Sequence, residues 1–345
     1  MAIMKGLVIQ MSKTLLAKYK NGNYNVILLS DGTKIRYNDG EDFKPKFPEN
    51  IDIKMTNWCD IGCAYCHERS STSGKPADFN RYKSLFNSLK KGTELAMGGG
   101  KMSSLLEELP NDYFHLEMFT RAASIEMRSD IEINSFLSLL LFLTLKRGII
   151  VNMTFNSNEV KDNFDIIVSY CKANLIYGVG VSYSRDNRDI LLKLKKEIGQ
   201  RLVIHTIAGI TQPMDYYWLA DNGFKVLILG FKDFGRGYDY KRLSQVQKSM
   251  HNSFDFLERK LQYLADNCET LSFDNLAIEQ LHVKSHVSKG TWETHYMGDD
   301  GRFTMYIDLV EGTYATNSTT PYEERLTIPE NDQDVSEMFK NILNK

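Results

Sequence analysis

The stretch that decides the reading of this chain is Asn57-Trp58-Cys59-Asp60-Ile61-Gly62-Cys63-Ala64-Tyr65-Cys66-His67-Glu68, which holds three cysteines in the spacing C-x3-C-x2-C. Soft thiolate ligands gathered in this way are typical of an iron–sulfur cluster or a zinc ion. A structural zinc site is usually closed by a fourth protein ligand. Here that ligand would have to be His67, Cys171, Cys268 or a distant histidine. A metal position left open is typical of a catalytic centre instead.

The two remaining cysteines, Cys171 and Cys268, are isolated in the sequence. An odd number of cysteines argues against a disulfide framework and predicts a reducing, cytoplasmic location. We expect both to be buried as small apolar side chains. The first residues lack the pattern of a signal peptide. The most apolar segment, residues 136–145, is far shorter than the roughly 20 residues that a bilayer span needs, so we expect no membrane association.

Composition places the chain among ordinary globular proteins. Its 345 residues are 42% hydrophobic and 25% charged, and the formal net charge is −2. No overall basic field indicates binding to nucleic acid or to an anionic membrane. A small local basic patch would still be compatible with these numbers, which leaves a nucleic-acid substrate open.

From residue 50 onward, short apolar runs alternate with segments of helical periodicity. The runs predict six strands, at residues 51–56, 94–97, 149–156, 176–182, 202–207 and 224–230. Helices are predicted at residues 78–91, 160–171, 189–198 and 214–222, and two or three more within 103–147, the last running from a cap at Asn134 to Gly148. This alternation indicates a parallel sheet covered on both faces. An open doubly wound sheet and a barrel both satisfy it.

The two ends of the chain depart from this rhythm. Strand-like runs at 24–29 and 33–37 flank Ser30-Asp31-Gly32, a strong hairpin signal. After the sixth strand we expect a long helix at 243–266, an extended segment at 270–274, a hairpin within 302–318 and a polar helix at the C-terminus. We expect this C-terminal portion to pack on the sheet.

The cysteine loop directly after a first strand, with aromatic Tyr65 just before the third cysteine, resembles the radical S-adenosylmethionine (radical SAM) superfamily. The resemblance covers residues 50–235. It implies an α/β fold with a partial (β/α)6 TIM-like barrel at 49–235. The patterns at the two ends add the expectation of a β-hairpin lead-in at 1–48 and a C-terminal α+β cap at 236–345. It also implies that Cys59, Cys63 and Cys66 bind three irons of a [4Fe–4S] cluster, whose fourth iron chelates SAM. Reductive cleavage of SAM would then yield a 5′-deoxyadenosyl radical that abstracts a hydrogen atom from the substrate.

Further site residues follow from the resemblance. Gly98, Gly99 and Gly100 stand where the family has a Gly-Gly-Glu motif that holds the methionine amino group. Gly100 replaces the usual glutamate, as in a branch of the superfamily with three glycines. The resemblance also implies SAM contacts from Tyr65, from Ser182 (with Ser184 as second choice), from His205 and from the backbone around Leu229. Further inward-facing candidates are Asn152 and Asn156 on the third strand, and residues 231–238 at the end of the sixth strand form either a substrate mouth or a solvated turn.

Two other functions stay open at this point: a zinc-binding structural or interaction protein using the three cysteines and His67, and an iron–sulfur electron carrier or regulator. Motifs of hydrolases, P-loop enzymes and zinc proteases are absent. Because only Cys268 lies beyond Cys171, we expect no auxiliary cluster. For the radical enzyme we expect a small molecule or a modified nucleoside or peptide group as substrate, and an external electron donor such as flavodoxin or ferredoxin.

Overall fold

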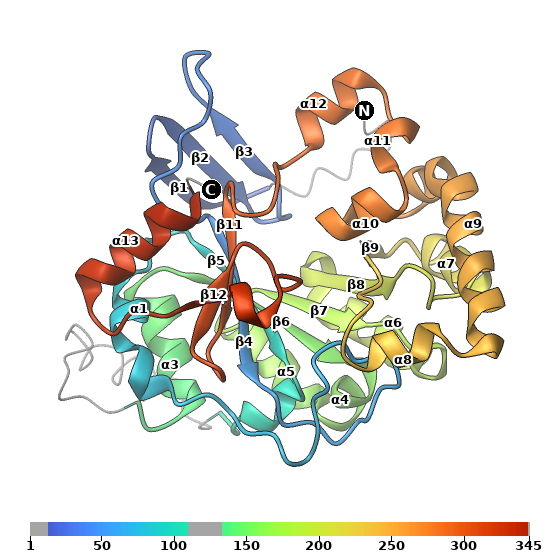
Figure 1. Cartoon of the computed structure of the whole chain (residues 1–345), viewed down its shortest axis with the longest axis horizontal. Helices are drawn as coiled ribbons and strands as arrows, with labels where there is room; N and C mark the ends of the chain where they lie inside the picture. The colour runs from blue at the N-terminus through green and yellow to red at the C-terminus, as the bar shows by residue number, and fades with distance from the viewer. Residues whose placement is uncertain (1–12, 110–132, 344–345) are drawn as a thin grey trace.

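A large, mostly parallel sheet forms the centre of the molecule in the computed structural model, which describes residues 13–109 and 133–343 (Figure 1). The six expected strands are present and pair in parallel in chain order: β4 (Asn50–Thr56), β5 (Glu94–Gly99), β6 (Ile150–Asn156), β7 (Gly178–Ser182), β8 (Leu202–Ile207) and β9 (Lys225–Leu229). The described sheet has ten strands, in the order β10-β9-β8-β7-β6-β5-β4-β11-β12-β13. The predicted α/β fold with a parallel barrel-like sheet is therefore confirmed.

Helices cover the outer face of this sheet. They include α1 (Lys83–Ser88), α3 (Phe136–Leu141), α4 (Ser157–Asp162), α5 (Phe164–Lys172), α6 (Arg188–Ile198) and α7 (Pro213–Asp221). The helix expected at 160–171 is two helices that meet at Asn163, and α4 begins with a capping box in which Asn156 and Glu159 each bind the other's backbone. The helix expected at 78–91 is a 3-10 turn (Phe79–Tyr82) followed by α1. The last helix expected before Gly148 is α3, continued by a π-helical turn (Phe142–Lys146), and its cap is Ser135 rather than Asn134. Residues 110–132, where other helices were expected, lie outside the described residues.

Alternate residues of the strands divide the sheet into two chemically different faces. On the outer face, Ile51, Ile53, Leu95, Met97 and Val151 are buried in one core with the helices. The concave face carries the residues between them, many of them small or polar: Asp52, Lys54, Ala96, Gly98, Asn152, Thr154, Asn156, Ser182, His205, Leu229, Tyr306 and Asp308. A ligand held inside the barrel would meet these side chains.

The N-terminal segment forms a separate three-stranded sheet of β1 (Leu15–Asn21), β2 (Tyr24–Leu29) and β3 (Lys34–Tyr37). The predicted hairpin is β2–β3, and β1 is an additional strand that the sequence analysis did not predict. The buried Glu49 carboxylate joins this sheet to the barrel, because it accepts hydrogen bonds from the Tyr24 hydroxyl at 2.5 Å and from the Arg36 Nε at 3.0 Å.

The C-terminal portion adds strands to both edges of the sheet, whereas it was expected only to pack on it. It comprises α8 (Arg236–Lys241), α9 (Ser244–Asn267), β10 (Thr270–Phe273), α10 (Asn275–Gln280), α11 (Val283–His286), α12 (Lys289–His295), β11 (Thr304–Asp308), β12 (Thr313–Ala315), β13 (Leu326–Thr327) and α13 (Asp332–Leu343). Strand β10 pairs in parallel with β9, and β11 pairs in parallel with β4. The expected hairpin at 302–318 is β11–β12.

Side chains bridge the seam between the two edges of the parallel sheet. In the described residues no strand ladder joins β10 to β11. Instead, Asp300 accepts hydrogen bonds from the Asn275 amide at 2.7 Å and from the Asn317 amide at 2.9 Å. The Lys232 ammonium, just beyond β9, donates to the Ser318 hydroxyl at 2.8 Å. The sheet is thus curled into a partial barrel.

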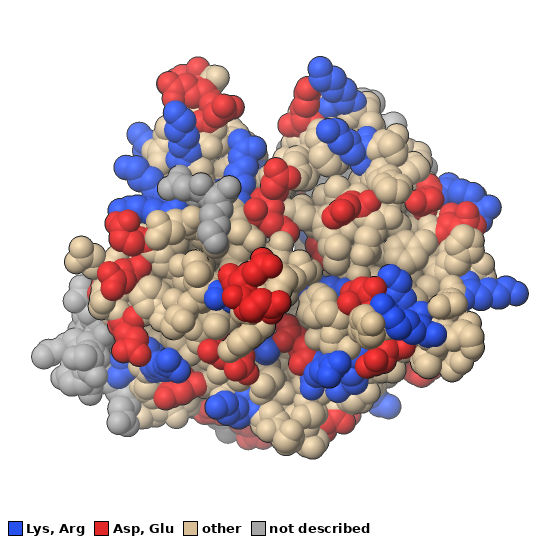
Figure 2. Space-filling model, in the orientation of Figure 1, with Lys and Arg blue, Asp and Glu red and all other residues tan. Residues whose placement is uncertain are grey.

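A search of the described helices for a membrane span found none with the necessary length and apolar character. Figure 2 shows acidic and basic side chains interspersed over the visible face, without a field of one sign.

Candidate functional site

The three cysteines lie in the loop that follows β4, at the carboxyl end of the parallel strands, where barrel enzymes carry their active sites. All three are free thiols and half-buried. Burial raises the pKa of the Cys63 thiol, and the nearby Cys66 and Cys59 sulfurs raise it further. The Cys59 and Cys66 sulfurs are therefore both close to the Cys63 thiol. No three His, Cys, Asp or Glu side chains in the described ranges are placed around one point as ligands of a single metal ion.

Residues 231–238 hold this loop in place, so they are not a merely solvated turn. The Arg236 guanidinium donates from Nε to the Cys63 carbonyl at 2.9 Å and from Nη1 to the Ser70 carbonyl at 3.1 Å. The backbone N–H of Arg236 donates to the Cys66 carbonyl at 3.0 Å. A Cβ on Gly235 would stand 2.1 Å from the His67 carbonyl oxygen, so only glycine allows this close packing.

The glycine triplet lies at the end of β5, beside the start of the cysteine loop. The N–H of Gly100 donates to the Thr56 carbonyl at 2.7 Å, and the N–H of Lys101 donates to the Trp58 carbonyl at 2.8 Å. A Cβ on Gly99 would stand 2.3 Å from the Thr56 oxygen, and one on Gly100 would stand 2.1 Å from the Trp58 oxygen. A Cβ on Gly98 would meet nothing within 4 Å. Gly98 is therefore the member of the triplet whose Cα faces open space.

Several predicted residues share one row on the concave face. Asn156, Ser182 and His205 lie in register on β6, β7 and β8. The Ser182 hydroxyl makes no hydrogen bond within the described part of the chain. Asn156 caps α4 by accepting from the Asn158 N–H at 2.9 Å, and Asn152 accepts from the Gly178 N–H at 2.9 Å, so both face inward but also serve the fold.

His205 is the predicted residue whose side chain has two ring nitrogens free to bind a ligand among the described residues. Gly180 makes room for its ring, because a Cβ there would stand 2.5 Å from Cε1 and 2.6 Å from Nε2 of His205. Neither ring nitrogen has a hydrogen-bond partner among the described residues, and neither is shut off from the space inside the barrel. Burial lowers the pKa of His205 to about 4, so the imidazole is neutral at neutral pH. It can therefore donate one hydrogen bond to a ligand and accept another.

The remaining predicted residues lie near this row. Leu229 ends β9 in register with Ile207, and its carbonyl accepts from the Ala208 N–H at 2.9 Å. Ser184 lies two residues beyond Ser182, just past the end of β7. The Tyr65 ring packs edge-on against Tyr240 of α8, with centroids 5.7 Å apart.

The sequence analysis missed a charged network between the cysteine loop and strands β4 and β11. The Lys54 ammonium lies 2.6 Å from a Glu68 oxygen and 3.1 Å from an Asp308 oxygen, and the Arg325 guanidinium lies 3.6 Å from Asp308. Burial by itself would lower the pKa of Lys54, but the Glu68 and Asp308 carboxylates raise it above its ordinary value. The alternation of side chains along β4 would have predicted that Lys54 lies on the inner face. Its partners could not be predicted, because Asp308 is more than 250 residues away in the sequence and no local pattern links the two.

His67 and the isolated cysteines bear on the zinc alternative. Nε2 of His67 lies 3.2 Å from the Lys232 ammonium and 3.3 Å from a Glu68 oxygen, so this nitrogen already has partners. Cys171 and Cys268 are buried, as predicted, and burial raises their pKa values to about 12 and about 11. Both thiols are thereby disfavoured as thiolate ligands.

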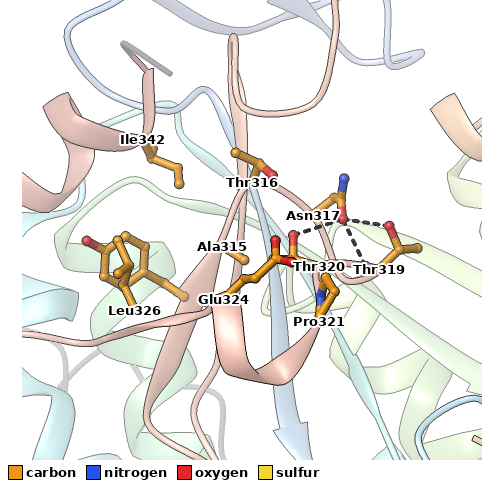
Figure 3. A pocket seen from close by; sticks show the side chains of 10 residues that line it. Ala315, Thr316, Asn317, Thr319, Thr320, Pro321, Glu324, Leu326 and Ile342 are labelled. Carbon is orange, nitrogen blue, oxygen red and sulfur yellow. Dashed lines mark hydrogen bonds between the residues drawn. The ribbon is translucent and has the colours of Figure 1, made fainter.

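Two pockets lie away from the cysteine loop. The one in Figure 3, of about 300 Å³, is lined by β12, the turn after it and the end of α13, and there Asn317 Oδ1 already accepts from Thr319 and Thr320. The other, of about 350 Å³, lies between β3 with its following loop and α12. It corresponds to the notch between the two projections at the top of Figure 2.

Comparison with known proteins finds proteins that resemble this chain in fold and not in sequence. No family model matches the chain, and no curated protein matches it in sequence. The SuiB structure of Streptococcus suis bound to the precursor peptide SuiA has a TM-score of 0.50 at 13% identity, over 87% of this chain and 66% of that chain. SuiB without the peptide has a TM-score of 0.50 at 11% identity, over 97% and 88%. The anSMEcpe structure with bound AdoMet has a TM-score of 0.48 at 12% identity, over 86% and 80%. The chain thus shares the fold of SuiB.

Proposed function

We propose that this chain is a radical SAM enzyme. The observation that carries the proposal is the placement of three half-buried thiols in one loop after β4, beside an open glycine at the end of β5. The fold shared with SuiB supports the proposal, because it is the partial barrel that the resemblance implies. When bound, a [4Fe–4S] cluster with an open iron would supply the electron that cleaves SAM.

The residues present fit such a cluster. Cys59, Cys63 and Cys66 would hold it, and three thiolates leave one iron without a protein ligand. Nη2 of Arg236 is buried without a hydrogen-bond partner in the described chain, while the other two nitrogens of the same group bind the cysteine loop. The Arg236 guanidinium acts on the Cys63 thiol, and its unpaired N–H suits an anionic group there, since hydrogen bonds to sulfur stabilise its charge.

The chain's own residues would then bind and orient SAM along the concave face. Gly98 leaves open space at the end of β5, the Ser182 hydroxyl has no partner among the described residues, and neutral His205 offers both a donor and an acceptor. Because position 100 is glycine where the family has glutamate, a backbone carbonyl would accept the hydrogen bond from the SAM amino group. The backbone around Leu229 and the ring of Tyr65 complete the proposed set.

For the substrate we propose a small molecule or a modified group of a nucleoside or peptide. The peptide choice has support in the SuiB structure, which holds a precursor peptide. An external donor such as flavodoxin or ferredoxin would supply the electron. We further propose that the cluster in the C-x3-C-x2-C loop is the sole one.

The test is anaerobic reconstitution with iron and sulfide, followed by addition of SAM and a strong reductant. We expect broad visible absorption from the cluster and the formation of 5′-deoxyadenosine. Cys63→Ala should abolish both, because Cys171 and Cys268 are buried elsewhere in the fold. Cys268→Ala is the matched control and should keep both. A colourless protein that binds only zinc would overturn the proposal, and a coloured protein that never cleaves SAM would favour the electron carrier.

A further inference from the structure

Asp52 is a carboxylate on the concave face that makes no ion pair with the described residues. Its side chain faces the space enclosed by the barrel, surrounded by protein but not covered by it, and the described residues give it one hydrogen bond, a long contact of 3.4 Å from the Asn50 amide. Within the described residues no lysine, arginine or histidine nitrogen lies within ion-pair distance of it. Asp308, on the neighbouring strand β11, contacts both Lys54 and Arg325. Lys54 and Arg325 are thus engaged by carboxylates other than Asp52.

Charges of both signs act on Asp52 from a distance. Burial inside the barrel is the largest cause of the rise of its pKa to about 6; the Lys232 ammonium lowers the pKa, and the Asp300 and Asp274 carboxylates raise it. Asp300 and Asp274 are already satisfied by donors of the protein, Asp300 by two amides and Asp274 by the N–H groups of Gly230 and Ala277. The Lys232 ammonium donates to Ser318 and contacts His67, and it forms no ion pair with Asp52 among the described residues.

A second polar group lies directly across from Asp52. Tyr306 of β11 pairs with Asp52 of β4, and both side chains are on the concave face. Tyr306 is only 4% exposed, and its hydroxyl has no hydrogen-bond partner in the part of the chain that the structure describes. The Arg325 guanidinium lies 5.1 Å from the ring centroid and influences the hydroxyl, but no hydrogen bond of ordinary geometry joins them. An unpaired buried hydroxyl costs free energy that a ligand could recover.

We propose that Asp52 and Tyr306 form a binding site for a protonated amine of the substrate. An ammonium carries three donors and no acceptor, so it can serve a carboxylate and a hydroxyl at once. Charge-assisted hydrogen bonds of this kind are the strong ones in a partly desolvated site. The site deepens the proposed function, on which it rests, because it assigns one functional group to the unknown substrate. It lies in the first half of β4, and the cysteine loop follows the end of that strand.

The test uses n-butylammonium and n-butyrate as probes of opposite charge on the full chain, with dissociation constants measured by NMR titration. We expect the wild-type chain to prefer the amine. Asp52→Asn should weaken amine binding about tenfold or more, as the loss of a charge-assisted hydrogen bond implies. Tyr306→Phe removes only the hydroxyl and should weaken it about threefold. Lys232→Met should keep or tighten it, because a repelling cation is removed.

Glu311→Gln is the matched control, since it removes the same charge from the exposed turn of the β11–β12 hairpin and should change nothing. Equal amine binding by the wild-type chain and Asp52→Asn would overturn the inference, as would undetectable binding or a preference for butyrate. Because the probes require neither cluster nor SAM, these outcomes are independent of 5′-deoxyadenosine formation. A chain that binds the amine through Asp52 but never cleaves SAM would refute the proposed function and keep the amine site.

Discussion

At the scale of single residues, the three glycines at the end of β5 have different roles. Gly99 has a positive φ of 131°, and together with Gly100 it allows the end of β5 to touch the backbone of the cysteine loop. Gly98 has neither constraint. The general argument that glycines let a ligand approach closely therefore applies to Gly98, whereas Gly99 and Gly100 are needed for the packing of the chain itself.

This difference predicts opposite results for two similar substitutions. Gly98→Ala should leave the thermal midpoint unchanged and weaken SAM binding, because the new methyl group enters open space on the concave face. Gly99→Ala should destabilise the fold by about 1–3 kcal/mol, since it combines a positive φ with a clash against the Thr56 carbonyl. Thermal unfolding and equilibrium binding of SAM measure the two effects. Equal loss of stability in both variants would contradict the assignment.

The Asp52 carboxyl predicts a pH-dependent stability. Its pKa in the folded chain, about 6, is above the value of about 3.9 expected for an unfolded chain, because burial disfavours the charged form. A group with a raised pKa contributes stability that is fully present below its unfolded pKa and is lost as pH rises through about 6.

Asp52→Asn should consequently stabilise the chain by about 1 kcal/mol near pH 7.5, a figure that allows for solvent screening of a partly open carboxylate. The gain should vanish near pH 4, where the wild-type carboxyl is already largely protonated in the folded chain. Denaturant unfolding at the two pH values measures the difference. A gain of equal size at both would show that the side chain, rather than its charge, sets the effect.

At the scale of elements, local patterns predicted what local forces determine. Continuous apolar runs identified all six core strands, and alternation along β6 placed Asn152 and Asn156 on the inner face. The pairing of β11 with β4 could not be predicted in this way, because the two strands are far apart in the sequence and neither encodes its partner. The same holds for Arg236 on the cysteine loop and for Tyr306 across from Asp52, whose contacts arise only when the sheet curls.

The junction of the N-terminal sheet with the barrel depends on one buried carboxylate. Glu49 is fully buried and binds Tyr24 and Arg36, while Lys34 lies 3.6 Å from it and 2.6 Å from Glu94. Glu49→Ala would leave the Arg36 and Lys34 charges with too few partners, so we expect a loss of about 3–5 kcal/mol in the free energy of unfolding.

Chemical denaturation measures this loss. The matched control is Glu337→Ala, which removes a carboxylate of an exposed pair with Lys340 on α13 and should cost less than about 1 kcal/mol. If the free energy of unfolding fell equally in the two variants, the Glu49 network would contribute no more to stability than a surface ion pair does.

At the scale of the whole molecule, side chains bridge the seam between the two edges of the partial barrel, where the described part of the chain has no strand ladder. Asp300 connects α10, which follows β10, to the segment after β12, and Lys232 adds a second bridge to the same segment. An opening of this seam would be the natural route into the barrel, because it breaks a few polar contacts and leaves the core between sheet and helices intact.

Asp300→Ala tests this role of the seam. The variant loses two hydrogen bonds, so we expect local opening to become easier by about 1–2 kcal/mol, with little change in global stability. Hydrogen exchange should speed up in peptides that cover β10 and the residues around 298–302 and 313–320, and stay unchanged in β5, β6 and β7. Glu197→Ala, which breaks an exposed pair with Lys172 on the outer helices, is the control and should leave the exchange of the seam unaltered. Faster exchange spread evenly over the sheet would mean that Asp300 supports the whole fold rather than a gate, and unchanged exchange at the seam would mean that other contacts hold the edges together.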